Sequence, residues 1–64
     1  MNHQLGDVIV FHMHNTNEGL YGEIIELHRR DHYILVRHDS ADICVESYEI
    51  SCNVSRVIEQ LRTI

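Results

Sequence analysis

The sequence predicts a mainly β protein: a small antiparallel barrel of four or five short strands that forms a single domain over residues 1–64. β-Branched and aromatic residues fall in short runs, and clusters of Gly, Asn, Asp and Ser, which favour turns, separate these runs. At 64 residues, with 44% hydrophobic residues, the chain can build one small core. Closure into a barrel would also leave no exposed strand edge.

Four strands are expected before the C-terminal segment. The first, "GDVIVFHM", covers residues 6–13, and the others cover residues 21–28, 32–38 and 43–48. Side chains alternate between the two faces of a strand, so Ile9 shares a face with Phe11. The connections carry turn-favouring or charged residues and cover residues 14–20, 29–31 and 39–42.

The C-terminal segment changes its hydrophobic period. Apolar residues recur there at helical spacing: Ile50, Val54, Val57, Ile58 and Leu61. Because Ser51 or Asn53 can cap a helix, we expect a short helix over about residues 53–62. The alternative is a fifth strand, with Val54 and Ile58 on one face and Val57 and Leu61 on the other. The apolar stripe of the helix would pack on the barrel or on a second copy, so a homodimer is one expectation.

The stretch "EGLYGEIIEL", residues 18–27, holds two of the three glycines. We expect Gly19 to adopt a positive φ at the end of the preceding loop, where a Cβ would be penalised. Gly22 lies inside a predicted strand, where glycine usually marks a bulge or a sharp bend. Both glycines therefore predict the curvature that a small barrel needs.

The charge balance is acidic, with a formal net charge of −5. The five basic residues are all arginines, and the chain contains ten Asp and Glu residues. Nonspecific nucleic-acid binding requires many cations, so this composition favours a protein partner with a basic surface. The sequence shows no signal-peptide pattern and no apolar run long enough to span a membrane. We therefore expect a cytoplasmic protein whose cysteines, Cys44 and Cys52, are reduced and buried.

Four quoted stretches carry a resemblance to a known fold family: "GDVIVF", "GLYGEIIEL", "HYILVRHD" and "DICV". In this order the chain resembles SH3-like small barrels of the KOW and Tudor kind, and it looks like short uncharacterised SH3-like proteins of bacteria and their phages. The resemblance covers residues 6 to about 50 and implies architecture more than activity. KOW-type nucleic-acid binders tend to be basic and Tudor-type readers use an aromatic cage. This chain is acidic and has no tryptophan.

The first candidate binding site is a group of four carboxylates: Asp39, Asp42, Glu46 and Glu49. Such a patch can dock on a basic protein surface, or imitate the spacing of phosphates as small nuclease inhibitors do. The alternative is a charged surface that only maintains solubility. This site predicts a non-enzymatic interaction module that binds a protein partner as a regulator or inhibitor.

The second candidate site centres on the turn "HRRDH", residues 28–32. Arginines in such a turn can bind phosphate in a bidentate manner, and a nearby tyrosine can stack on a base. The residues of this site would be Arg29, Arg30, Tyr33 and Arg37. It predicts the alternative function, a nucleic-acid-binding small barrel. An ordinary solvated turn would have the same composition.

Neither a metal site nor catalysis is expected from the six histidines. His12 and His14 would share one face of a strand, and His28 and His32 flank the "RRD" turn. A zinc site needs three or four converging ligands, and no HExxH or CxxC spacing is present. No nucleophile motif surrounds Cys44. We therefore expect no cofactor and no enzyme activity.

Overall fold

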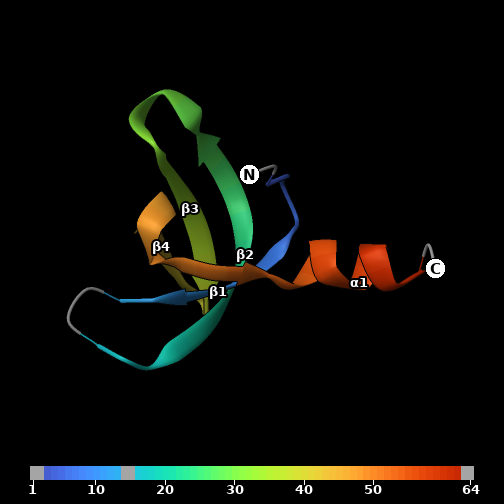
Figure 1. Ribbon diagram of the computed structural model, residues 1–64. Helices are drawn as coiled ribbons and strands as arrows, with labels where there is room; N and C mark the ends of the chain where they lie inside the picture. The colour runs from blue at the N-terminus through green and yellow to red at the C-terminus, as the bar shows by residue number, and fades with distance from the viewer. Residues whose placement is uncertain (1–2, 14–15, 63–64) are drawn as a thin grey trace.

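The computed structural model describes residues 3–13 and 16–62, and it is mainly β (Figure 1). The predicted fold class is confirmed: antiparallel strands form one sheet, and a short helix follows at the C-terminal end. In chain order the elements are β1 (Val8–His12), β2 (Gly19–His28), the 3₁₀ turn η1 (Arg29–Asp31), β3 (Tyr33–His38), β4 (Ala41–Glu46), the 3₁₀ turn η2 (Ser47–Glu49), β5 (Ile50–Asn53) and α1 (Val54–Arg62).

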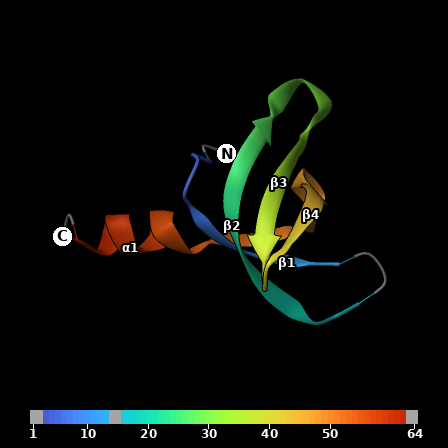
Figure 2. The ribbon, with the colours of Figure 1, turned by 180° about the vertical axis from the view of Figure 1, so that it is seen from behind.

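The sheet is strongly bent but does not close into a barrel. Its strand order is β4-β3-β2-β1-β5, so β4 and β5 are the two edges of the sheet in the described residues. Figure 2 shows the long curved hairpin of β2 and β3 from behind. After β4 the chain turns through η2 and enters β5, which pairs with β1 rather than with β4. The expected closure is therefore incomplete, and an open strand edge remains at β4.

The C-terminal segment contains both structures that the sequence left open. Ile50 belongs to β5, whereas the helix begins at Val54. A strand over the stripe from Val54 to Leu61 was therefore the wrong alternative. The helix extends away from the sheet (Figure 1), and the side chains of Val57, Ile58 and Leu61 are exposed. No helix in the described part of the chain is long and apolar enough to cross a membrane.

The core lies on the concave side of the sheet. Alternate residues of four strands meet there: Ile9, Phe11, Ile24, Ile34, Val36 and Val45. Leu20, Leu27, Ile43 and Ile50 pack against them and are partly buried. Burial of these side chains is the main favourable contribution to folding, at about 1.5–3 kcal/mol for each fully buried side chain. The prediction that Ile9 and Phe11 share a face of the first strand is confirmed, and this face is the inward one, since both side chains are completely buried.

Gly22 provides room for the core rather than a bulge. It lies opposite Ile9 in the regular β1–β2 pair. A Cβ at Gly22 would lie 3.0 Å from Phe11 Cε1 and 3.1 Å from Val36 Cβ. The bulge of β2 falls after Ile24 instead, where the register against β3 shifts. The expectation of a bulge at Gly22 is therefore wrong, because the position is needed for close packing.

Gly19 also differs from its expectation. Among the described glycines, the positive φ belongs to Gly6, at 88°, and not to Gly19. Gly19 instead opens β2 opposite His12, and a Cβ there would lie 3.3 Å from Val10 Cγ1. A small residue is favoured at this strand end by the neighbouring side chain.

The connection between β3 and β4 is shorter than predicted. Asp39 and Ser40 have φ angles of 50° and 69°, and His38 pairs directly with Ala41. A two-residue hairpin with two positive φ angles is a type I′ turn, whose twist matches that of the strands. β4 therefore begins at Ala41 and passes Cys44, which is exposed. Cys52 is half-buried, and both cysteines are free, so the burial predicted for Cys44 is wrong.

Candidate functional site

The convex face of the sheet gathers carboxylates from β2 and β4. Residues directly opposite each other in an antiparallel pair project to the same side. Arg37 of β3 lies opposite both Glu23 of β2 and Asp42 of β4, so these three residues form a row across the sheet. The next rows toward η1 contain Glu26, Leu35 and Cys44, and then His28, Tyr33 and Glu46. We call the four carboxylates of these rows the acidic face: Glu23, Glu26, Asp42 and Glu46.

Arg37 is the basic residue within this face, and it is paired. Its Nε lies 3.1 Å from Asp42 Oδ1, and both side chains are about half exposed. An exposed pair of this kind contributes only about 0.2–1 kcal/mol to stability. Asp42 therefore remains accessible to a stronger basic partner.

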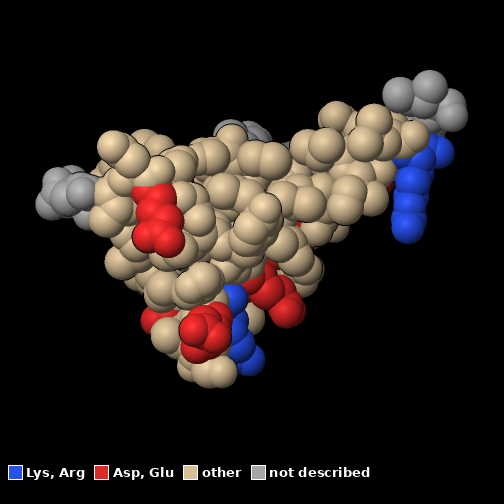
Figure 3. Space-filling model, turned by 90° about the horizontal axis from the view of Figure 1, so that it is seen from below, with Lys and Arg blue, Asp and Glu red and all other residues tan. Residues whose placement is uncertain are grey.

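The structure divides the acidic residues predicted from the sequence. Asp39, in the type I′ turn, and Asp42 lie at one end of β4, whereas Glu46 and Glu49 lie at the other end, about 13 Å away along an extended strand. Figure 3 shows the acidic side chains in separate patches rather than as one cluster. Glu49 is partly committed to the fold, because its Oε1 accepts a hydrogen bond of 3.0 Å from the Glu46 N–H.

Glu23 and Glu26 were missed as candidates. The alternation of β2 indicates the outward direction of Glu23, because Gly22 and Ile24 point inward. The same alternation would turn Glu26 inward, and Glu26 points outward only because of the bulge after Ile24. The sequence alone does not show that Glu23 and Glu26 lie near Asp42, because their position depends on the register of β2 against β3 and on the bulge after Ile24. A one-residue change of register would have reversed the faces.

The structure also separates the residues of the second candidate site, which was predicted around the arginines of the "HRRDH" turn. Arg30 lies exposed in η1, and the side chain of Arg29 is outside the described part of the structure. Tyr33 stacks on His28 with ring centroids 4.4 Å apart. Arg37 lies four residues along β3, next to Asp42. The structure thus brings Tyr33 close to the turn but places Arg37 in an acidic surrounding.

A hollow of about 260 Å³ lies beside η1, between the N-terminal segment and the end of the β2–β3 hairpin. Its lining consists of His3, Leu27, His28, His32, Tyr33, Ile34 and Ser47. Ser47 Oγ donates to the backbone carbonyl of His32 at 3.2 Å. His28 Nε2 lies 2.8 Å from Glu26 Oε1. Side chains around the hollow are thus engaged in local contacts.

The histidines do not assemble a metal centre in the described residues. No group of three or more His, Cys, Asp or Glu side chains is placed to hold a metal ion there. His28 and His32 flank η1 as expected, and both line the hollow. His12 Nδ1 lies 3.2 Å from the backbone carbonyl oxygen of Glu18 and donates to it in the tautomer that carries the Nδ1 proton. His14 lies outside the described residues.

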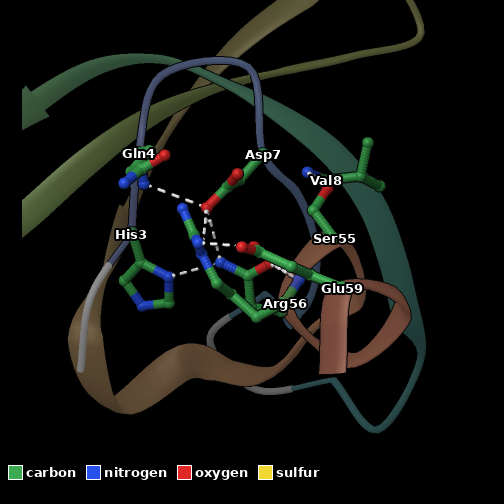
Figure 4. A network of polar contacts seen from close by, with 8 residues as sticks. His3, Gln4, Asp7, Val8, Ser55, Arg56 and Glu59 are labelled. Atoms are coloured by element: carbon green, nitrogen blue, oxygen red, sulfur yellow. Dashed lines mark hydrogen bonds and ion pairs between the residues drawn. The ribbon is translucent and has the colours of Figure 1, made fainter. Parts of the chain in front are cut away.

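A buried polar network fixes the start of α1 (Figure 4). Asp7 Oδ2 accepts hydrogen bonds from the Gln4 N–H at 3.0 Å and from Asn53 Nδ2 at 2.9 Å. Asn53 Oδ1 accepts from the Arg56 N–H at 3.0 Å, so Asn53 is the N-cap of the helix. Arg56 Nε lies 3.4 Å from Asp7 Oδ2. The network positions α1 relative to β1 and is structural in character.

Within this network the pKa values of two groups, Asp7 and His3, are lowered. Burial would raise the pKa of Asp7, but the hydrogen bonds from Asn53 and Gln4 and the charge of Arg56 outweigh it, and the pKa falls below its ordinary value. The pKa of His3 is lowered mainly by burial, against an opposing effect of Asp7. His3 Nδ1 lies 2.9 Å from Asn53 Nδ2, so the imidazole accepts a hydrogen bond in its neutral form. The pair is therefore an anionic Asp7 and a neutral His3.

Comparison of this chain with family models, with curated proteins and with solved structures found no match. The fold and the acidic face are therefore the basis for any functional proposal.

Proposed function

We propose that this protein is a non-enzymatic interaction module whose acidic face docks on a basic surface of a protein partner, which it regulates or inhibits. The observation that carries the proposal is the register of β2, β3 and β4. It places Glu23, Glu26, Asp42 and Glu46 on one exposed face, with Arg37 among them. The formal net charge of −5 supports the same type of partner.

Electrostatic docking of this kind should depend on several ion pairs and on the salt concentration. Each exposed ion pair contributes little alone, so affinity would arise from several pairs and from a faster encounter rate. Exposed charges are screened over about 10 Å at 0.1 M salt, so binding should weaken as salt increases.

Affinity capture from the native host tests the proposal. The bait is compared with a face variant, Glu23→Gln/Asp42→Asn, and with a control of equal net charge, Glu18→Gln/Asp31→Asn, whose carboxylates are exposed outside the acidic face. We expect mass spectrometry to find a basic protein with the wild type and the control and to lose it with the face variant. Equal recovery by all three baits would contradict the proposal.

The rival function is nucleic-acid binding through η1. The exposed Arg30 of η1 and the stack of Tyr33 on His28, which flank this turn, favour it, since they offer a cation and an aromatic surface. It requires retardation of DNA or RNA that weakens steeply with salt and is lost in Arg29→Ala/Arg30→Ala. The absence of oligonucleotide binding at low salt would remove it.

A second copy of the chain is the other partner that we propose, bound through α1. The exposed Val57, Ile58 and Leu61 form one stripe on this helix. α1 carries two arginines, Arg56 and Arg62, and one glutamate, so it does not share the acidic charge of the chain as a whole.

A further inference from the structure

We propose that the open edge of β4 takes up an extended basic segment of a partner protein as an additional antiparallel strand. This inference rests on the proposed function and specifies the chemistry of the partner. It starts from the topology, in which β4 pairs with β3 on one side and is an edge of the sheet on the other side.

The hairpin geometry determines which backbone groups face the open side. In a two-residue hairpin the first pair, here His38 with Ala41, exchanges hydrogen bonds. Such pairs alternate along a regular antiparallel ladder, and the β3–β4 register contains no shift. The N–H and C=O groups of Asp42 and Cys44 therefore point to the open side. The Glu46 N–H also points there, and the Glu49 carboxylate already occupies it at 3.0 Å.

Glu49 thus ends the edge at the η2 side and leaves the segment before it available. Ala41, Asp42 and Cys44 are exposed, which is consistent with free access. Ile43 is only half-buried, so an added strand with an apolar residue beside it would cover more of its surface. The site is therefore about five residues long, which matches a typical short strand.

Charge selects the occupant. In an added strand centred opposite Cys44, the residues two positions on either side lie next to Asp42 and Glu46. Basic side chains at these two positions would meet the Asp42 carboxylate, which is paired with the exposed Arg37, and the Glu46 carboxylate, which also accepts from the Glu49 N–H in a capping box. A second β4 paired in the same way would place Asp42 opposite Glu46 twice, which is repulsive. The edge therefore favours a basic segment with a Lys-x-x-x-Lys pattern over another copy of the chain.

The experiment uses the full ¹⁵N-labelled chain and a blocked peptide, Gly-Lys-Val-Thr-Val-Lys-Gly. We expect chemical-shift changes over Ala41–Val45 and slower hydrogen exchange of the Asp42 and Cys44 amides in the complex. Asp42→Asn/Glu46→Gln should weaken the affinity about fivefold to tenfold, and Glu18→Gln should leave it unchanged. The peptide with Glu in place of Lys should not bind.

Backbone methylation separates strand addition from simple charge attraction. N-Methylation of the central Thr removes the N–H that faces Cys44 and should abolish binding, whereas N-methylation of a neighbouring Val should have little effect. If both methylated peptides bind equally and the amides gain no protection, strand addition is wrong while the acidic face remains a docking surface. No binding at low salt would also overturn the inference. The proposed function would fail separately, by equal capture with the wild type and the face variant.

Discussion

Asp7 Oδ2 accepts a hydrogen bond of 2.9 Å from Asn53 Nδ2, and this contact joins two residues 46 positions apart in the chain. Both residues are buried, with 8% of each exposed. Asn53 is the last residue of β5 and caps α1, and Asp7 immediately precedes β1. One carboxylate thus connects the first strand, the last strand and the helix.

Asn53→Ala should lower the free energy of unfolding by about 2–4 kcal/mol. The loss of the helix cap contributes about 1 kcal/mol, and a buried carboxylate without one of its donors adds about 1–3 kcal/mol. Urea unfolding followed by circular dichroism measures the change. Asn17→Ala, at an exposed loop position, is the control and should change stability by less than about 0.5 kcal/mol. Equal midpoints for both variants would contradict the role of the network.

Asp7 also predicts acid sensitivity. Its pKa is lower in the folded chain than the ordinary value of 3.8, so the folded state binds this proton less readily than the unfolded state. The stabilisation by Asp7 is therefore fully present above about pH 4 and is lost as the pH falls through the lower, folded pKa. In thermal melts from pH 5 to pH 2, Asp7→Asn should start with a lower Tm and then lose less of it than the wild type. Parallel curves would show that Asp7 does not titrate differently on folding.

The fold class and the helix were predictable because local patterns determine them. Short apolar runs between turn residues indicated the strands, and the spacing of Val54, Val57, Ile58 and Leu61 indicated α1. The open edge was not predictable, because it depends on whether β5 pairs with β1 or with β4. Nor was the burial of Asp7, which reads in the sequence as an ordinary turn residue.

Gly22→Val should destabilise the fold before it affects any binding. The added side chain would begin 3.0 Å from Phe11 Cε1 and 3.1 Å from Val36 Cγ2, both fully buried. Overpacking of a core costs about 1–3 kcal/mol and occasionally more. Denaturant titration should therefore show a clearly lower midpoint, or no folded protein, for Gly22→Val. Gly19→Ala meets only Val10 Cγ1 at 3.3 Å and the His12 ring at 3.7 Å, so it should be milder. A wild-type midpoint for Gly22→Val would mean that the core does not pack around this position.

Ser40→Gly should stabilise the β3–β4 hairpin. Ser40 has a φ of 69°, in the left-handed region where a Cβ costs about 1–2 kcal/mol. Glycine adopts this φ without strain, although it also increases the entropy of the unfolded chain. We expect a net gain of about 0.5–1 kcal/mol, measured as a higher Tm. The control is Ser51→Gly, on β5, which should lose stability because glycine weakens a strand. A lower Tm for Ser40→Gly would contradict the type I′ turn.

The candidate site shows a similar division between local and nonlocal information. Glu46 and Glu49 are close in the sequence and were therefore predicted as members of one binding site. In the structure the Glu49 carboxylate instead accepts a hydrogen bond from the Glu46 N–H. The acidic face depends instead on the pairing of β2 with β3 and of β3 with β4. The register therefore adds Glu23 and Glu26 to the candidates.

The stripe on α1 gives the last prediction, on self-association. A helix of nine residues is marginal in water by itself, and the network around Asn53 holds only its first turn. Val57, Ile58 and Leu61 are 46%, 47% and 65% exposed, so the described part of the chain covers them incompletely. A second copy would bury them and extend the order of the helix toward Arg62.

Sedimentation equilibrium over a range of concentrations tests this self-association. We expect the mass of wild-type protein to increase with concentration, and Ile58→Ser/Leu61→Ser to remain monomeric. The substitutions are at exposed positions, so the stability of the monomer should change by less than about 1 kcal/mol. Glu18→Gln, outside the helix, should associate like the wild type. A wild-type protein that remains monomeric at high concentration would refute the dimer and leave the stripe of α1 without a partner among copies of this chain.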